Sequence, residues 1–425
     1  MNTHAALLTI KSLLQSFIAS RQYSLDLCKN LEVEDMGLQA VAETSPLKWH
    51  LAHTSWFYET FVLKYFVKNF KVFHPAFETL FNSYYNGIGK PFKRPNRGLL
   101  SRPTVEDVKH YRKHVDDAVI QLLNELEYMA ENQTKTLIER VSLGIQHEKQ
   151  HQELMLTDLK YNFYQNPLLP TYSEQAPNFS QDSISKDHLD WHKFNEGLHS
   201  FGFSQGSFCF DNEMPSHKIY LPEFAIANRC ITNSEYLDFI NDGGYQKSEY
   251  WLSDGWAWVE QNNISKPLYW WQQDGEWLEY TLYGKQRLTP NRTLCHISFY
   301  EADAFARWAG NRLPNEYEWE LLAQSQSIET SKERALYYHP TCEETGDLFN
   351  QVWQWTQSNY APYPGFKPAS GAIGEYNGKF MCNQMVLRGG SCLSPSDHIR
   401  STYRNFFYPA DRWQMTGIRL AQDRG

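Results

Sequence analysis

The sequence predicts a two-domain α+β protein, in which a four-helix bundle is followed by a mixed domain of short strands, turns and a few short helices. Three observations support this prediction. The chain has 425 residues, which is too many for one ordinary core. Apolar residues recur at helical spacing as far as about residue 165, whereas from about residue 192 short β-like runs alternate with Gly, Pro and Asn turns. We therefore predict a bundle at residues 1–165, a linker at 166–191 and a second domain at 192–425.

The first two helices are predicted from apolar spacing and from start signals. Residues 1–20 are apolar in a helical rhythm and no basic region precedes them, so they predict an amphipathic helix rather than a signal peptide. The second helix is expected to begin with Ser45 as its N-cap and Pro46 as its first helical residue.

Two further helices complete the predicted bundle. Thr104 with Glu106–Asp107 forms a capping-box pattern at the start of the third helix, and the fourth is expected from about Thr134 to Tyr161. Residues 81–103, rich in Gly, Pro and Arg, must form a long loop between the second and third helices. Four such helices pack most economically as a bundle.

The linker and the second domain are predicted from a change in residue composition and in hydrophobic periodicity. Residues 164–191 are rich in Pro, Ser, Gln and Asn and show no clear period, which is typical of a connection between domains. Beyond them, SFCF (207–210), HKIYL (217–221) and VLRGGSC (386–392) are short β-like runs between turns.

The composition argues against several classes of function. A net charge of −9 disfavours non-specific binding to nucleic acid, and no run of about 18 apolar residues indicates a membrane span. The seven cysteines form no CxxC pair, which fits a reducing cytosol and indicates neither a disulfide framework nor a zinc ribbon. We expect a cytoplasmic protein with no nucleic-acid or membrane partner.

Two histidines in the segment IQHEKQHQELM (145–155) are candidates for metal binding. His147 and His151 lie one turn apart on the same face of the predicted helix, where Gly144 leaves room and the other positions are apolar. Imidazoles that point into a bundle need partners, because unpaired polar groups in a core are costly. A metal ion would satisfy both imidazoles.

A third ligand is expected from another helix, because metal-binding bundles take their ligands from facing helices. The sequence WHLAH offers His50 and His53. Trp49 and Trp56 flank His53 at helical spacing, which indicates burial, whereas His50 lies on a neighbouring stripe. The alternative is that these histidines are core residues bonded to carbonyls or carboxylates.

The same segment contains HExxH, the signature of zinc peptidases. The third ligand of such enzymes is missing from its expected places. One subclass would need Gly and His where this chain has Leu154 and Thr157, and another needs a Glu on a following helix, where an irregular linker stands instead. Glu148 is therefore expected to be a polar neighbour of the histidines rather than a general base.

Five segments of the second domain carry a family resemblance and occur in that family's order: DNEMPSHKIYLPEFAIANRCITNSEYLDFINDGGY (211–245), NRLPNEYEWELLA (311–323), NQVWQWT (350–356), LRGGSC (387–392) and GIRLA (417–421). Together they resemble the formylglycine-generating-enzyme fold, a C-type-lectin-like mixed domain. The places of that family's copper-binding cysteine pair hold approximately Ser394 and Ile399, so the domain is expected to serve another chemistry. Relatives of the fold bind calcium, and the sequence leaves a structural Ca²⁺ open.

A DinB-like bundle with an LAH…HxxQHQE histidine set, followed by this domain, resembles the ergothioneine-biosynthesis sulfoxide synthases over essentially the whole chain. The resemblance implies a mononuclear non-haem iron(II) enzyme that uses O₂ to join the sulfur of cysteine, or of γ-glutamylcysteine, to imidazole C2 of hercynine as a sulfoxide. It places the iron on His53, His147 and His151. Three histidines leave positions open for a thiolate, an imidazole and O₂, and both soft thiolate and imidazole suit Fe(II).

The resemblance also implies residues close to the metal. Gln150, between the two helix histidines, would bond the substrate imidazole. Some family members use a tyrosine of the second domain to prevent oxidation of the thiol to a sulfinic acid, but in the matching segment AIGEYNGKF Ile373 replaces it and only Tyr376 of the Y-x-x-Y pair is kept. Another branch has a tyrosine pair in the bundle loop, and Tyr84 and Tyr85 match that pair.

Substrate recognition is implied in two further places. Arg94 and Arg97 have the R-x-x-R spacing that the family uses for the thiol substrate, and Arg is a forked partner for carboxylates. Asn405, Phe406 and Phe407 are expected beside Tyr376, where aromatic faces suit the trimethylammonium of hercynine. Phe407 replaces an Asp that holds the thiol substrate in the γ-glutamylcysteine-using branch, which favours free cysteine as the donor.

Four alternatives stay open at this point. An ovothiol-type enzyme would join sulfur to a different imidazole carbon, and the regiochemistry cannot be read from the residues. A zinc-dependent HExxH hydrolase, a DinB-like thiol transferase without O₂ chemistry and a ligand-binding module with structural histidines are the other three. The sequence does not reveal the oligomeric state.

Overall fold

The computed structural model describes residues 3–126, 129–174, 189–206, 208–326, 337–341 and 348–424. The chain divides into two compact units. The first comprises Met1–Asn166 and a later segment, Ala369–Tyr376, and the second comprises Pro167–Pro368 and Asn377–Gly425. Of the predicted linker, residues 175–188 lie outside the described residues.

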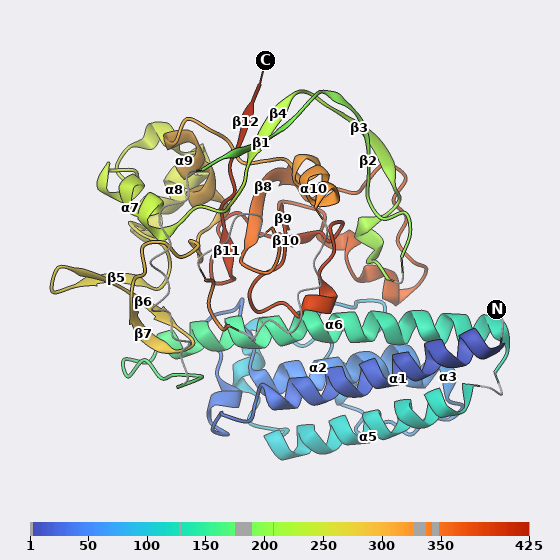
Figure 1. The fold of residues 1–425 in the computed structure, drawn as a ribbon. Coiled ribbons are helices and arrows are strands. Elements are labelled where there is room, and N and C mark those ends of the chain that lie inside the picture. The colour runs from blue at the N-terminus through green and yellow to red at the C-terminus, as the bar shows by residue number, and fades with distance from the viewer. Residues whose placement is uncertain are drawn as a thin grey trace. The chain divides into compact units, whose positions relative to one another are not determined.

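The first unit is a bundle of long helices, drawn in blue to green in Figure 1. Helix α1 packs on α5 and α6, and α2 packs on the same two helices, so the four lie side by side as the sequence predicted. The bundle helices are α1 (Thr3–Asp26), α2 (Leu47–Tyr58), α5 (Val105–Asn124) and α6 (Glu131–Tyr164). A π turn (Glu59–Leu63) and α3 (Lys64–Phe66) extend α2, and the loops carry 3₁₀ turns (Asp35–Gly37, Arg94–Leu99) and α4 (Phe77–Leu80).

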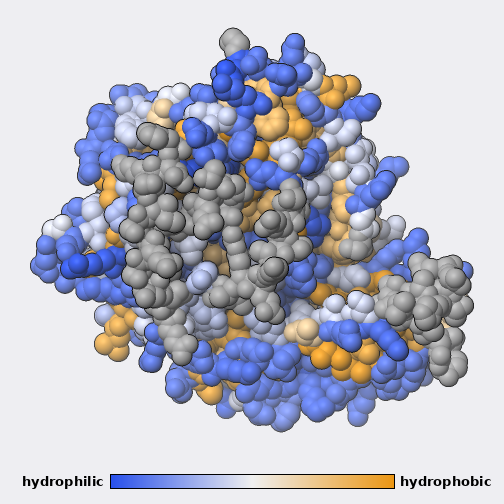
Figure 2. All heavy atoms as spheres, in the orientation of Figure 1, coloured by the Kyte–Doolittle hydropathy of each residue, from blue (hydrophilic) through white to orange (hydrophobic). Residues whose placement is uncertain are grey.

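The start of α5 is as predicted. The Thr104 side chain accepts a hydrogen bond from the Asp107 N–H, and the Asp107 carboxylate accepts one from the Thr104 N–H. This capping box satisfies two backbone donors that the helix itself leaves unpaired. The outer surface of the bundle in Figure 2 is mostly hydrophilic, which fits helices that bury one apolar face each.

The predicted start of α2 is wrong by one residue. Pro46 is the N-cap and the helix begins at Leu47, with no side-chain cap. Ser45 is occupied by other partners: its hydroxyl accepts from Arg97 Nη1 at 2.9 Å and its N–H donates to Asp158 Oδ2 at 2.8 Å. The sequence signal for a cap was therefore a side chain that serves tertiary structure instead.

A buried charge cluster joins the four helices. Glu148 of α6 is fully buried and accepts hydrogen bonds from Arg21 Nη1 (3.0 Å) and Ser24 Oγ (2.6 Å) of α1 and from Arg112 Nη2 of α5. Arg112 Nη1 also donates to Thr54 Oγ1 of α2 at 3.1 Å. Burial alone would oppose ionisation of Glu148, but Arg112 and Arg21 outweigh it and hold the pKa of Glu148 at about 2.

The second unit is built from short strands and helices, coloured yellow-green to red in Figure 1. Its strands form a β1–β4–β12 sheet, a β10–β9–β8–β11 sheet, a β2–β3 hairpin and a β5–β6–β7 meander among the described residues. The strands are β1 (Trp191–Phe194), β2 (Gly197–Phe201), β3 (His217–Leu221), β4 (Phe224–Ala227), β5 (Trp270–Gln273), β6 (Glu276–Thr281), β7 (Gly284–Arg287), β8 (Trp353–Asn359), β9 (Met385–Arg388), β10 (Asn405–Phe407), β11 (Thr416–Gly417) and β12 (Ala421–Asp423). The helices are α7 (Asn233–Asn241), α8 (Ser253–Asn262), α9 (Phe299–Trp308) and α10 (Glu316–Ser325), and 3₁₀ turns cover Asp211–Glu213, Ser248–Tyr250, Gly378–Phe380 and Ser396–His398.

The predicted α+β class is confirmed, and two of the three predicted β-like runs contribute strands. HKIYL is β3, and the first part of VLRGGSC lies in β9. The described part of SFCF forms no strand, because the Phe210 N–H donates to the Glu213 carboxylate and the backbone turns there. No helix among the described residues is long and apolar enough to cross a membrane.

Replacing Glu148 tests the charge cluster. Glu148→Gln removes the anionic partner of two buried guanidinium groups, so we expect the free energy of unfolding to fall by about 3–5 kcal/mol. Glu139→Gln, the same change at an exposed position of α6, should stay within about 0.5 kcal/mol of the unaltered chain. Urea unfolding measures both, and equal stability of the two variants would contradict a structural role for Glu148.

Candidate metal centre

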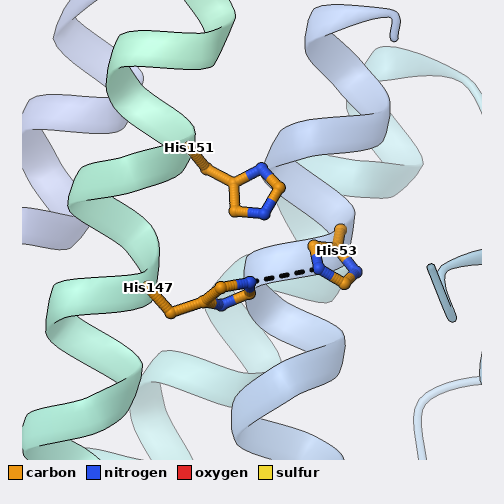
Figure 3. A group of neighbouring side chains, drawn as sticks. All are labelled: His53, His147 and His151. Atoms are coloured by element: carbon orange, nitrogen blue, oxygen red, sulfur yellow. Dashed lines mark hydrogen bonds between the residues drawn. The ribbon is translucent and has the colours of Figure 1, made fainter. Parts of the chain in front are cut away.

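Three histidines converge from two helices of the bundle (Figure 3). His53 comes from α2, and His147 and His151 come from adjacent turns of α6. One ring nitrogen from each lies within 4.8 Å of the others, and Nε2 of His53 is 3.2 Å from Nε2 of His147. Two nitrogens bonded at roughly 2.1 Å to one ion, at about a right angle, would lie about 3.0 Å apart. The arrangement therefore fits a metal site.

Aromatic rings hold His53 in place. Its imidazole is stacked between two indoles, with ring centroids 4.6 Å from Trp49 and 5.6 Å from Trp56. His53 Nδ1 lies 2.6 Å from the Phe81 carbonyl, which can only accept, so Nδ1 carries the proton and Nε2 keeps its lone pair. The indole N–H groups donate to the carbonyls of Leu80 (3.0 Å) and Glu78 (3.1 Å), so the α4 segment fixes all three rings.

The three imidazoles are neutral, which is the form that binds a metal. Burial lowers the pKa of His147 to about 3. Burial, and then the nearby His147, lower the pKa of His53 and of His151 well below the ordinary value. Lone pairs on uncharged rings thus face a common point. His147 Nδ1 is buried without a hydrogen-bond partner among the described residues.

Gly144 brings α2 and α6 close together one turn from His147. A Cβ placed on Gly144 would lie 2.5 Å from Cε1 and 2.7 Å from Cζ of Tyr58. Tyr58 is fully buried at the end of α2, so the ring has little freedom to move aside. The space that the sequence predicted beside the imidazole pair is therefore filled by Tyr58. The contact between Tyr58 and Gly144 sets the spacing of the two helices.

Glu148 does not serve this centre. Its carboxylate oxygens are bonded to Arg21, Arg112 and Ser24. A peptidase base must instead be within reach of a metal-bound water. The geometry agrees with the expectation that Glu148 is a polar neighbour and gives no support to the zinc-hydrolase alternative.

Gln150 and Tyr376 lie beside the histidines. The Tyr376 hydroxyl donates to Gln150 Oε1, and the Tyr376 ring centroid is 5.6 Å from that of His147. Tyr376 is the last residue of Ala369–Tyr376, the segment that belongs to the first unit. Ile373, the residue at the missing tyrosine position, lies in the 3₁₀ turn Ala372–Glu375 of the same segment.

Tyr84 and Tyr85 contact residues that surround the histidines. The rings of Tyr84 and Tyr85 stack at 4.5 Å with their hydroxyls 3.4 Å apart. Tyr85 is fully buried, and its ring centroid is 5.4 Å from that of Trp56. The Tyr84 hydroxyl donates to the Tyr376 carbonyl at 3.5 Å. The pair therefore touches residues that themselves touch two of the three histidines.

A glutamate holds the loop that carries this pair. The carboxylate of Glu375 accepts hydrogen bonds from the N–H groups of Asn86 (3.1 Å) and Gly87 (2.7 Å). A Cβ on Gly87 would come within 2.9 Å of Glu375 Oε1 and 3.2 Å of Ala372 Cβ, so a side chain there would crowd the carboxylate that holds the loop.

The two predicted arginines differ in their surroundings. Arg97 is 2% exposed, its guanidinium carbon lies 3.4 Å from the Trp49 ring centroid, and it donates to Ser45 Oγ and Ser83 Oγ. Burial lowers the pKa of Arg97 well below the ordinary value, and the charge of Asp158 acts in the opposite direction. Arg94 is exposed and donates to the Glu43 carbonyl.

Asn405, Phe406 and Phe407 belong to the second unit, where they form β10 paired with β9. Phe406 stacks on Tyr360 at 4.0 Å. Their predicted part in substrate binding stays a prediction, as does the structural calcium ion. Ser394 and Ile399 hold no thiol, and Ser394 Oγ accepts from the Ser391 N–H at 2.9 Å.

Sequence reasoning missed two acidic residues. Asp158, seven residues after His151 on α6, lies 3.2 Å from His50 Nε2, and helical spacing could have singled it out. Glu375 gave no local signal, because it meets the bundle loop across a separation of 289 residues.

Fold and site together define a helical bundle with a three-histidine centre joined to a mixed α+β domain. The chain matches the Sulfatase-modifying factor enzyme 1-like domain over residues 195–345 and 342–424, and the DinB superfamily over residues 16–155. It belongs to the family of proteins with a sulfatase-modifying factor enzyme 1-like domain.

Relatives match this chain over different shares of its length. A hercynine oxygenase of Mycolicibacterium thermoresistibile is 28% identical over 413 residues, covering 89% of this chain and 87% of the relative. One from Mycobacterium tuberculosis is 28% identical over 410 residues, covering 89% and 91%. Ergothioneine biosynthesis protein 1 of Schizosaccharomyces pombe is 26% identical over 231 residues, which is 51% of this chain and 28% of that protein. Among solved structures, PvdO from Pseudomonas aeruginosa is similar over 59% of this chain and 100% of its own, at 18% identity and a TM-score of 0.38.

The predicted resemblance to ergothioneine-biosynthesis enzymes is confirmed by these relatives, and the chain is an enzyme of this two-domain type.

Substituting Gly144 tests the helix contact that spaces the histidines. Helix propensity alone predicts that Gly144→Ala stabilises the chain by about 1 kcal/mol. The clash with Tyr58 predicts the opposite sign, a net loss of about 1–2 kcal/mol after overpacking is set against propensity. Gly89→Ala, at a loop glycine with nothing within 4 Å of the new methyl group, is the control. Stabilisation by Gly144→Ala in urea unfolding would contradict the close contact.

Proposed function

We propose that the protein is a non-haem iron(II), O₂-dependent sulfoxide synthase that joins the sulfur of cysteine to imidazole C2 of hercynine. The observation that carries the proposal is the convergence of three neutral imidazoles, those of His53 and His147 buried and that of His151 partly buried, in a chain that is similar to hercynine oxygenases along most of its length. The reaction balances as thiol plus imidazole C–H plus O₂ giving the C–S-linked sulfoxide plus water. The thiol proton and the C2 proton leave in that water.

The metal would be held by His53, His147 and His151. A ferrous ion bound there would bind the thiolate and O₂ side by side, and the electrons that reduce O₂ would come from the thiol and the imidazole C–H bond. The donor set suits this task because three neutral histidines leave the ion its full +2 charge, which favours a deprotonated thiol. The aromatic stack around His53 excludes water from one side of the site.

Side chains next to the histidines would orient the substrates. Gln150 presents an amide to the substrate imidazole, and its bond to the Tyr376 hydroxyl fixes which way the amide points. Arg97 would bind the cysteine carboxylate, because among the described residues the Nη groups of this buried guanidinium donate only to the neutral hydroxyls of Ser45 and Ser83. Arg94, at the surface, would add positive charge beside it. Asn405, Phe406 and Phe407 are proposed for the trimethylammonium.

The tyrosine pair would lend a proton and an electron during the reaction and take both back from the substrates before the turnover ends. Burial, and then the neighbouring Tyr84, raise the pKa of Tyr85 well above its ordinary value, so its phenol stays protonated. Tyr84 bonds to the Tyr85 hydroxyl and to the Tyr376 carbonyl, which places the pair in contact with residues around the imidazoles. A phenol at this position would divert the reaction from sulfinate formation to C–S bond formation.

Free cysteine is the proposed donor, with γ-glutamylcysteine as the alternative. Phe407 stands where the γ-glutamylcysteine-using branch has an acidic residue, and the loop tyrosines match the other branch. Sulfur transfer to a different imidazole carbon, as in ovothiol-type enzymes, is the alternative regiochemistry.

Anaerobic reconstitution tests the function directly. The chain is loaded with Fe(II), mixed with hercynine and cysteine, and exposed to O₂. We expect a product with the mass of the C–S-linked sulfoxide, and proton NMR should show loss of the C2 hydrogen. A parallel reaction with γ-glutamylcysteine decides the donor. His53→Ala should abolish iron binding, and tight zinc binding with no iron-dependent product would contradict the proposal.

The tyrosine assignment has its own test. Tyr84→Phe and Tyr85→Phe remove one hydroxyl each and should shift turnover from sulfoxide to cysteine sulfinate by about tenfold or more, because proton delivery is lost. The product ratio is measured by mass spectrometry. Tyr65→Phe, at a tyrosine that is 63% exposed, should leave the ratio unchanged. An unchanged ratio in both Tyr84→Phe and Tyr85→Phe would show that the pair has no part in the chemistry.

A further inference from the structure

His50 contacts one of the three histidines but is not itself a member of the candidate metal centre. Its Nδ1 is 2.7 Å from Nδ1 of His151, and its Nε2 is 3.2 Å from Oδ2 of Asp158. One ring nitrogen of His50 therefore faces a member of the triad and the other faces a carboxylate. The group of residues that could share one ion contains His53, His147 and His151 without His50. His50 and Asp158 are buried, with 2% and 1% of their surfaces exposed.

The positions of the protons follow from these partners. A carboxylate accepts, so His50 Nε2 carries a proton and donates it to Asp158. A neutral His50 then has a lone pair on Nδ1, and the short contact with His151 requires that His151 Nδ1 carries the proton between them. His151 is thereby left with its lone pair on Nε2, the remaining ring nitrogen.

We infer that Asp158 and His50 form an outer-sphere relay that sets the tautomer and the ring orientation of His151, so that its Nε2 is available to the metal. This inference rests on the proposed metal site. Outer partners of this kind fix the orientation of ligating imidazoles and raise their basicity. His50 and Asp158 are positioning residues, because neither touches the reacting atoms.

The relay is anchored beyond Asp158. The same Oδ2 atom accepts from the Ser45 N–H at 2.8 Å, and the Ser45 hydroxyl accepts from Arg97 Nη1 at 2.9 Å. The residue proposed to bind the substrate carboxylate and the metal ligand His151 thus share one chain of hydrogen bonds. Asp158 therefore lies between the Ser45 N–H, just before α2, and His50 on α2.

Two substitutions of nearly the same shape separate a relay from simple packing. His50→Asn places a carbonyl oxygen where Nδ1 lies and can still accept from His151, whereas His50→Leu cannot. The metal-free full chain is titrated anaerobically with Co(II), whose absorption spectrum reports both affinity and coordination. We expect His50→Leu to weaken Co(II) binding by about 10–100-fold with an altered spectrum. His50→Asn should stay within about threefold of the unaltered chain.

Asp158→Asn provides a second arm that does not need His50→Leu to fold. The amide is a weaker acceptor than the carboxylate but can still accept from Ser45. Introduced alone, Asp158→Asn should weaken Co(II) binding. Combined with His50→Asn it should have no further effect, because the shorter amide accepts from His151 without depending on residue 158. Thermal unfolding of each metal-free variant monitors the fold.

The outcomes separate the relay from the metal site. Equal Co(II) affinity of His50→Leu and His50→Asn, or the same loss from Asp158→Asn in both backgrounds, would overturn the relay while the metal site stands. No Co(II) binding by the unaltered chain would overturn both.

Discussion

The rest of the bundle depends on the buried contact between Glu148 and the guanidinium groups of Arg21 and Arg112. Successive residues of an α-helix point about 100° apart. A carboxylate anchored to α1 and α5 therefore turns the neighbouring His147, and His151 one turn later, towards α2. Rotation of α6 about its axis would separate a buried carboxylate from its partners, which is strongly unfavourable. The orientation of the histidines is therefore fixed by the buried ion pairs of Glu148.

Glu148 and His147 are adjacent in sequence, but their side chains lie in different surroundings. The charged face of α6 meets two arginines, while the face one residue away meets indoles, a tyrosine and other imidazoles. Burial among such neighbours keeps the histidines neutral. The positive charge of Arg97, stacked on the indole that also covers His53, acts in the same direction. Such a site offers imidazole lone pairs near the positive charge of Arg97, which would suit the thiolate substrate proposed above.

The first unit is completed by a segment from far along the chain. Ala369–Tyr376 places Tyr376 against His147 and Gln150 and uses Glu375 to hold the loop of Tyr84 and Tyr85. The tyrosine pair and the histidines are therefore connected through a segment that lies more than 200 positions from α6 in sequence.

The sequence by itself determined the features that local spacing encodes. Amphipathic periodicity predicted the four bundle helices, the capping box marked the start of α5, and the HxxxH spacing with two flanking tryptophans singled out His147, His151 and His53. Other features depend on partners that periodicity does not contain. Ser45 looked like a helix cap but serves Arg97 and Asp158, and His50 looked like a rival ligand but bonds to His151. Only the tertiary structure decided these roles, because a polar side chain takes its part from whichever donors and acceptors packing brings within about 3 Å.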